Sequence, residues 1–168
     1  ISLEYLHSSV GVKERPPNVY SETREIDFPR ALNFQLTWQN GFEAGSTSDE
    51  GFDLDLYVTD PNDNEFSWNN VGFATNNPGL DKDNRGEDFG NIGDIGGPED
   101  MFWRDNDQVT RGVWKYRVKM FNKNTEARFC NWRVDVFLSG VIGQTNQGTF
   151  QNSANFDAGS SVFNYLIQ

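Results

Sequence analysis

Carboxylate side chains recur through one stretch of the sequence. Asp53 and Asp55 are one strand repeat apart in FDLDLYVT, and Asp81 and Asp83 repeat that spacing in LDKD. Residues 43–107 contain 17 acidic and 3 basic residues, a net charge of −14, whereas the rest of the chain has 8 acidic and 11 basic residues. Like charges at this density oppose a compact fold unless a cation neutralises them. Clustered carboxylate, amide and carbonyl oxygens are the ligands that Ca²⁺ prefers, so the stretch predicts a calcium site.

Neither acidic repeat completes an EF-hand loop. Glu65 follows Asp60-x-Asn62-x-Asn64 where that loop needs glycine, and the repeat that begins at Asp81 has Ile92 where it needs a bidentate glutamate. A calcium site here must therefore combine strand carboxylates with ligands from a long loop. The alternative is a solvated acidic surface with Asn and Asp in its turns.

Catalytic signatures are missing from the sequence. It has no G-x-S-x-G, no H-E-x-x-H, no glycine-rich phosphate loop and no Cys–His pair. The one catalytic alternative is a glycoside-active enzyme that works through paired carboxylates, and no pair of acids is singled out for that role. We therefore expect a protein that is not an enzyme.

Composition limits the partners of this chain. A net charge of −11 and a pI of about 4.4 argue against binding to nucleic acid or to anionic membranes, because both require basic patches. No apolar run approaches the roughly 20 residues of a membrane-spanning helix. The single cysteine, Cys130, rules out an intramolecular disulfide. Its place in an alternating apolar row predicts a buried, reduced thiol.

Alternating apolar and polar residues predict an all-β fold. In residues 52–59, for example, Leu54 and Leu56 share an apolar face, while Asp53, Asp55 and Tyr57 share the opposite one. The expected strands are Ala31–Trp38, Phe52–Thr59, Glu65–Trp68, Met101–Arg104, Gly112–Phe121, Phe129–Leu138, a weak one at Gly148–Gln151, and Ser160–Ile167. Short alternating strands with turns between them predict an antiparallel β-sandwich, of the jelly-roll type, with a long acidic metal-binding loop before residue 100.

The connections suggest a simple organisation. Residues 112–121 and 129–138 are expected to form a hairpin, because turn residues separate them. Pro16-Pro17 breaks any regular element near the start, so residues 1–22 are expected to form an arm or linker. Residues 23–168 are then expected to form a single β-sandwich domain.

Aromatic residues lie beside the acidic segments. Tyr57, Trp68 and Trp103 are candidate ligand-binding residues, since an exposed ring next to a bound cation stacks on a sugar while the metal takes its hydroxyls. Packing of these rings beneath a long loop is the alternative. The basic residues Lys115, Arg117, Lys119 and Arg133 are expected to be neighbours on one sheet surface, which would suit an acidic polysaccharide or would balance acids on an adjacent strand.

Four segments together resemble a known family. They are DLDLYVTDP (53–61), LDKD (80–83), GGPED (96–100) and GVWKYRVKMF (112–121), and they are similar to the bacterial pre-peptidase C-terminal domain and a related secreted family. The resemblance covers about residues 50–121. It implies a calcium-associated β-sandwich module of an exported or surface protein, with a set of metal-binding residues at Asp53, Asp55, Asp81, Asp83 and Glu99.

The functional expectation follows from these signals. We expect a secreted or cell-surface, calcium-binding, non-catalytic module that binds carbohydrate or another surface polymer. One alternative is a structural jelly-roll subunit of a coat, fibre or matrix, in which calcium is only a staple. The other is the carboxylate-dependent, glycoside-active enzyme.

Overall fold

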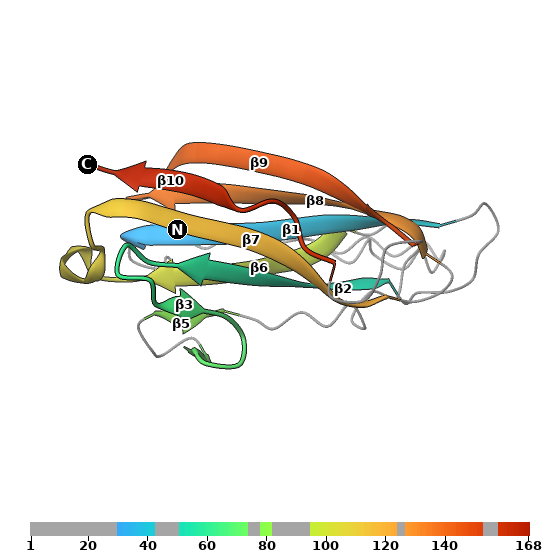
Figure 1. Cartoon of the computed structure of the whole chain (residues 1–168), viewed down its shortest axis with the longest axis horizontal. Helices are drawn as coiled ribbons and strands as arrows, with labels where there is room; N and C mark the ends of the chain where they lie inside the picture. The colour runs from blue at the N-terminus through green and yellow to red at the C-terminus, as the bar shows by residue number, and fades with distance from the viewer. Residues whose placement is uncertain (1–29, 43–50, 74–77, 82–94, 124–126, 153–157) are drawn as a thin grey trace, which may run out of the picture.

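Two β-sheets packed face to face make up the part of the chain that the computed structural model describes, which is residues 30–42, 51–73, 78–81, 95–123, 127–152 and 158–168 (Figure 1). The strands are β1 Leu32–Phe42, β2 Phe52–Thr59, β3 Glu65–Phe66, β4 Gly72–Phe73, β5 Gly79–Leu80, β6 Ile95–Trp103, β7 Gly112–Lys123, β8 Ala127–Leu138, β9 Val141–Gln151 and β10 Phe163–Ile167. A 3₁₀ turn, Asn106–Gln108, precedes β7. None of the described residues forms a helix long and apolar enough to cross a membrane.

The strand order defines a six-stranded and a four-stranded sheet. The six-stranded sheet runs β4-β5-β6-β1-β8-β9, and the four-stranded sheet runs β10-β7-β2-β3. Every described pair is antiparallel except β4 with β5. A two-residue turn joins β8 to β9, and both of its residues, Ser139 and Gly140, have positive φ (49° and 77°). Positive φ at both central positions is the type I′ geometry that matches the twist of a hairpin.

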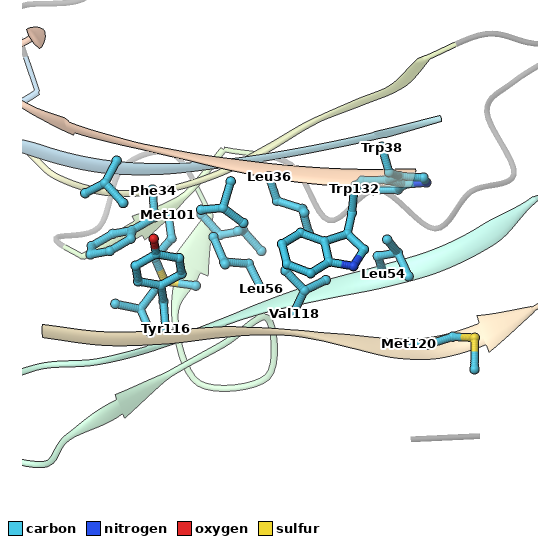
Figure 2. Close-up of a cluster of buried hydrophobic side chains, with 14 of the residues drawn as sticks. Phe34, Leu36, Trp38, Leu54, Leu56, Met101, Tyr116, Val118, Met120 and Trp132 are labelled. Carbon is cyan, nitrogen blue, oxygen red and sulfur yellow. The ribbon is translucent and has the colours of Figure 1, made fainter. Parts of the chain in front are cut away.

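The core fills the space between the sheets. Figure 2 shows Leu36 and Trp132 of the six-stranded sheet facing Leu56 and Val118 of the four-stranded sheet. These side chains are 5% exposed or less, as the alternation in their strands predicts. The expected all-β, two-sheet architecture is thus confirmed, although nothing in this strand order establishes a jelly roll.

The expected hairpin between residues 112–121 and 129–138 is wrong. β7 pairs with β2 and β10 in the four-stranded sheet, whereas β8 pairs with β1 and β9 in the six-stranded sheet. Both strands turn their apolar faces to the same core from opposite sides. Alternation fixes which face is buried, but it does not select the partner strand.

The bounds of several strands differ from the expected ones, and those of β9 and β6 differ most. β9 runs through all of Val141–Gln151 instead of a short piece at its end, and its inward positions Gln144 and Asn146 are polar, which hides the alternation. β6 begins at Ile95 and not at Met101, so Glu99 lies on a strand of the sheet. The expected arm at 1–22 and the loop residues 82–94 lie outside the described residues.

Candidate functional site

The open edge of β2 is the place where the two sheets exchange side-chain hydrogen bonds. β3 covers this edge only at Val58 and Thr59, which pair with Phe66 and Glu65. In the part of β2 that precedes Val58, side chains of the six-stranded sheet form hydrogen bonds with the backbone N–H and C=O groups of β2. At the start of the strand, Phe52 N–H donates to Asn40 Oδ1 and Phe52 O accepts from Trp38 Nε1, both at 3.0 Å.

Glu99 closes the same edge near its middle. On β6 it lies opposite Leu36 of β1 and alternates with Met101 and Trp103, so its side chain is directed between the sheets. Its Oε2 accepts the backbone N–H of Leu56 at 3.0 Å, and its other oxygen, Oε1, is also fully buried. This glutamate, 1% exposed, is therefore a carboxylate held inside the rim of the sandwich against β2.

Asp53 and Asp55 lie on the outer face of β2, opposite Asn122 and Lys119 of β7. A residue on the outer face of a sandwich is expected to be solvent-exposed, yet Asp53 is only 8% and Asp55 only 3% exposed. Each has one carboxylate oxygen, Oδ1 of Asp53 and Oδ2 of Asp55, with almost no solvent contact. Together with Glu99, they place three buried carboxylates along four residues of one strand, Asp53 to Leu56.

Trp68 explains part of this burial. Its ring meets that of Phe121 on β7 edge to face, with centroids 5.9 Å apart, and its side chain also forms a hydrogen bond with Tyr57 on β2. The position between Tyr57 and Phe121 on this face is occupied by Asp55 and Lys119. Trp68 therefore lies across the outer face of β2 beside Asp55, while 38% of its own surface stays exposed.

The pKa of the Tyr57 phenol responds to the charges around it on the outer face of β2. Burial, followed by the negative charges of Asp55 and Glu65, raises the pKa of Tyr57 above its ordinary value, against the opposing effects of Arg117 and Trp68. Arg117 and Lys119 approach its ring to 5.1 and 5.2 Å from the centroid. The face is thus a mixed patch of carboxylates, cations and rings, in which neither sign of charge dominates.

The predicted basic row is wrong in one member, because Arg133 lies on β8 of the other sheet. The part of the row on β7 is balanced by acids. Lys115 Nζ lies 2.9 Å from Asp63 Oδ1, and Arg117 Nη2 lies 2.9 Å from Glu65 Oε2. The turn after β2 and strand β3 carry both acids. This is the alternative reading of the row, and it weakens the case for an acidic polysaccharide on this face.

Asp81 is not brought together with the β2 carboxylates. It is exposed, and its Oδ2 lies 3.6 Å from Arg30, which also holds Asp100 Oδ2 at 3.2 Å. Asp100 pairs with Gln35 of β1 on the outer face of the six-stranded sheet, away from β2. Burial raises the pKa of Asp100, although Arg30 and a hydrogen bond from Asn33 oppose the shift. Asp83 lies outside the described residues.

The described residues do not by themselves complete a metal site. Among them, no three His, Cys, Asp or Glu side chains lie close enough together to hold an ion. Asp53, Asp55 and Glu99 share one stretch of β2, but Glu99 approaches it from inside the sandwich and the two aspartates lie on its outer face. The five-residue calcium set therefore stays a prediction.

Trp103 is buried, so it is not available as a ligand-binding residue on the surface. It is 3% exposed, and its ring packs edge to face against Trp114 at 4.8 Å and Phe66 at 5.3 Å. It alternates in phase with Met101 on the inner face of β6, so its nearness to acids in the sequence does not bring it to the surface. Of the three aromatic candidates, Trp68 is exposed and Tyr57 half-buried.

A polar group inside the sandwich was missed in the sequence. Tyr116 Oη on β7, 1% exposed, accepts hydrogen bonds from Gln144 Nε2 at 2.9 Å and Asn146 Nδ2 at 2.5 Å on β9. Burial raises the pKa of Tyr116 despite these two bonds. The sequence signal for this group is the pair of amide side chains two residues apart, at 144 and 146. Polar side chains on an inward face require buried hydrogen-bond partners, and the Tyr116 hydroxyl is such a partner.

Comparisons with known proteins found no similar protein. No protein-family model matches the chain, and neither the curated proteins nor the solved structures include a significant match. The resemblance to the pre-peptidase C-terminal domain accordingly remains a prediction from the four quoted segments.

Proposed function

We propose that the protein is a non-catalytic β-sandwich module stabilised by Ca²⁺ bound beside β2, with Asp53 and Asp55 among the ligands on the outer face and Glu99 supporting the same stretch of strand from inside the sandwich. The observation that supports this most is the burial of all three carboxylates along one short stretch of strand. Removing a carboxylate from water costs several kcal/mol unless charge and hydrogen bonds compensate. A bound cation would add to the compensation that the protein itself provides, such as the Leu56 N–H at Glu99 and Lys119 opposite Asp55.

The chemistry of these ligands favours calcium over other metals. The carboxylates of Asp53 and Asp55 are hard oxygen donors, and the described part of the chain places no His or Cys beside them, which disfavours zinc and copper. Ca²⁺ accepts six to eight oxygens in flexible geometry, so backbone carbonyls and further loop carboxylates complete its shell without strict spacing. The resemblance offers Asp83 as a candidate for one of these further carboxylates.

Direct binding tests this proposal. Isothermal titration of the chelator-treated protein with CaCl₂ should give saturable binding, and Asp55→Asn should abolish it or weaken it by more than about tenfold, since one charged ligand is lost. Asp135→Asn is the matched control, because Asp135 is also buried but lies on β8 with Arg133 and Thr145 as its partners. Equal weakening in both variants, or no binding by the unmodified protein, would refute a specific site.

We propose carbohydrate, or another surface polymer, as the ligand of this module. The supporting observation is the exposed pair of rings, Trp68 and Phe121, which lie edge to face over the same face as Asp55 and Tyr57. An exposed indole beside oxygen-rich side chains suits the apolar face and the hydroxyls of a sugar ring. In this proposal the module belongs to a secreted or surface-exposed protein.

A further inference from the structure

β9 forms the longest open sheet edge in the described part of the chain. The edge strands of the two sheets are β4, β9, β10 and β3, with lengths of 2, 11, 5 and 2 residues. β9 pairs with β8 along one side, and none of the described strands pairs with its other side. Short edge strands limit unwanted pairing, and β9 is the exception.

The backbone groups that point to the open side can be assigned. Asn152 N–H donates to Arg128 O at 2.8 Å, which makes this directly opposed pair a hydrogen-bonded one. The register then continues without a shift from Phe129↔Gln151 to Val136↔Gln144. Hydrogen-bonded pairs alternate in an antiparallel ladder, so even-numbered residues of β9 bond to β8. The N–H and C=O groups of Thr145, Gln147, Thr149 and Gln151 therefore face outward from the edge.

The usual protection against edge pairing is missing here. Residues 136–156 contain no Asp, Glu, Lys, Arg or Pro, in a chain with a net charge of −11. Edge strands are commonly blocked by charged side chains, above all Lys, or by proline. Two copies of so acidic a chain repel each other over most of their surface, and an uncharged strip is where they can approach.

Side chains leave the edge accessible as well. Thr145 Oγ1 donates to Asp135 on β8, and Thr149 Oγ1 donates to Asn131 Oδ1 on β8 at 2.8 Å. Both hydroxyls are thus turned back over their own sheet and away from the open backbone groups. Thr and Gln at the outward positions are also compatible with cross-strand pairing, in which Thr–Thr contacts are favourable.

We propose that β9 pairs antiparallel with β9 of a second copy of this chain, which joins the two six-stranded sheets into one continuous sheet. Antiparallel pairing of a strand with its own copy is isologous, so a two-fold axis midway between the two strands generates a closed dimer and not an open fibre. Uncharged and self-complementary, β9 fits a second copy better than it fits a charged partner segment.

Substitutions at Gln147 test the proposal, because this exposed residue donates its N–H to the open side and makes no contact that β8 needs. Gln147→Pro removes that N–H and inserts a ring into the seam, while proline is tolerated on an edge strand whose N–H faces solvent. Gln147→Ala keeps the N–H and is the matched control. Gln147→Glu adds a charge to the seam in each copy, with Arg133 directly opposite on β8 to accommodate it within the monomer.

Sedimentation equilibrium of the full chain, from low micromolar to several hundred micromolar, measures the outcome. We expect a dimer for the unmodified protein and for Gln147→Ala, and dimerisation weakened by more than about tenfold in Kd for Gln147→Pro and Gln147→Glu. Should Gln147→Pro fail to fold, Gln147→Glu carries the test alone. A monomer at every concentration, or a dimer that both variants leave intact, would overturn the proposal.

Amide exchange supplies a readout that a merely destabilised strand does not reproduce. In the dimer, the amides of Thr145, Gln147, Thr149 and Gln151 should exchange slowly, and dilution should expose them. The amides of Gln144, Asn146 and Phe150 bond to β8 and should stay protected at all concentrations. Loss of protection in both sets on dilution, or in neither, would contradict pairing through this edge.

Discussion

Glu99 of β6 accepts the backbone N–H of Leu56 of β2 at 3.0 Å, and this bond joins the two sheets across the rim of the sandwich. The six-stranded sheet supplies the carboxylate, and the four-stranded sheet supplies the amide. A buried glutamate thus accepts a backbone N–H of β2 that would otherwise need an acceptor on a neighbouring strand. The bond lies in the same stretch of β2 that carries Asp53 and Asp55.

Replacement of Glu99 should destabilise the fold. Glu99→Ala leaves the Leu56 N–H buried without its acceptor, and such a loss costs about 1–3 kcal/mol in the free energy of unfolding. Glu65→Ala is the control, since its ion pair with Arg117 is exposed and is worth about 0–1 kcal/mol. Urea denaturation of both variants measures the difference. Equal, small effects would show that the Glu99 bond contributes little to joining the sheets.

Calcium should raise thermal stability, and EDTA should lower it. A ligand that binds only the folded state stabilises it by about 2.7 kcal/mol at one hundred times its Kd. Asp53→Asn and Asp55→Asn should abolish the response, whereas Asp135→Asn should keep it. Superimposable melting curves in calcium and in EDTA would contradict a calcium site. Equal loss in all three variants would indicate nonspecific screening of the acidic chain.

Cys130 should resist labelling in the folded protein. Its side chain is buried at 0% exposure in the core, and burial raises the pKa of the thiol well above its ordinary value, so almost no thiolate forms near neutral pH. A disulfide reagent should react slowly with the native protein and rapidly after addition of denaturant. Fast reaction in the native state would show that the core opens readily around β8.

Several features of the fold were predictable from local pattern, and others were not. The alternation of Leu54 and Leu56 with Asp53 and Asp55 gave the correct inner and outer faces of β2, because side chains of a strand alternate strictly. The pairing of β7 with β2 was not predicted, since partner choice depends on contacts between residues far apart in the sequence. Alternation also does not show whether other side chains cover an outer face. The burial of Asp55, which is 3% exposed on the outer face of β2, was therefore not predictable.

The candidate site was predictable to a similar extent. The acidic spacing led to Asp53 and Asp55, and the family resemblance added Glu99; the fold places all three along one stretch of β2. The same reasoning grouped Asp81 with them, but Arg30 holds it on the other sheet. Trp103 was assigned to the surface from its neighbours in the sequence, although its phase with Met101 directs it into the core.

The carboxyl of Asp100 should make stability depend on pH. Because burial raises its pKa in the folded state above the ordinary value of 3.8, the folded protein binds a proton more readily than the unfolded one. Its contribution to the free energy of unfolding therefore falls as the pH rises through the window above 3.8. In Asp100→Asn this fall should disappear. Urea denaturation at a series of pH values tests it, and a wild-type minus variant difference that is flat or rises with pH would contradict the assignment.

Ligand binding should depend on Trp68 and on calcium. On a glycan array, we expect neutral or lightly charged sugars to bind in Ca²⁺ and to be released by EDTA, because the proposed site combines the exposed Trp68 ring with the carboxylates beside β2. Trp68→Ala should abolish this binding while the calcium-dependent melting shift is retained. Leu166→Ala is the control, as this side chain is 57% exposed on β10, away from β2.

The alternative outcomes of the array distinguish the remaining hypotheses. Binding only to sulfated or uronic polymers, insensitive to EDTA and lost at high salt, would move the site to the β7 cations. We do not expect this result, because Asp63 already pairs with Lys115 and Glu65 with Arg117 at 2.9 Å. A polyanion would have to displace Asp63 to gain Lys115 and Glu65 to gain Arg117. No glycan binding at all, with the calcium response intact, would favour a structural subunit in which the ion joins β2 to the rest of the sandwich.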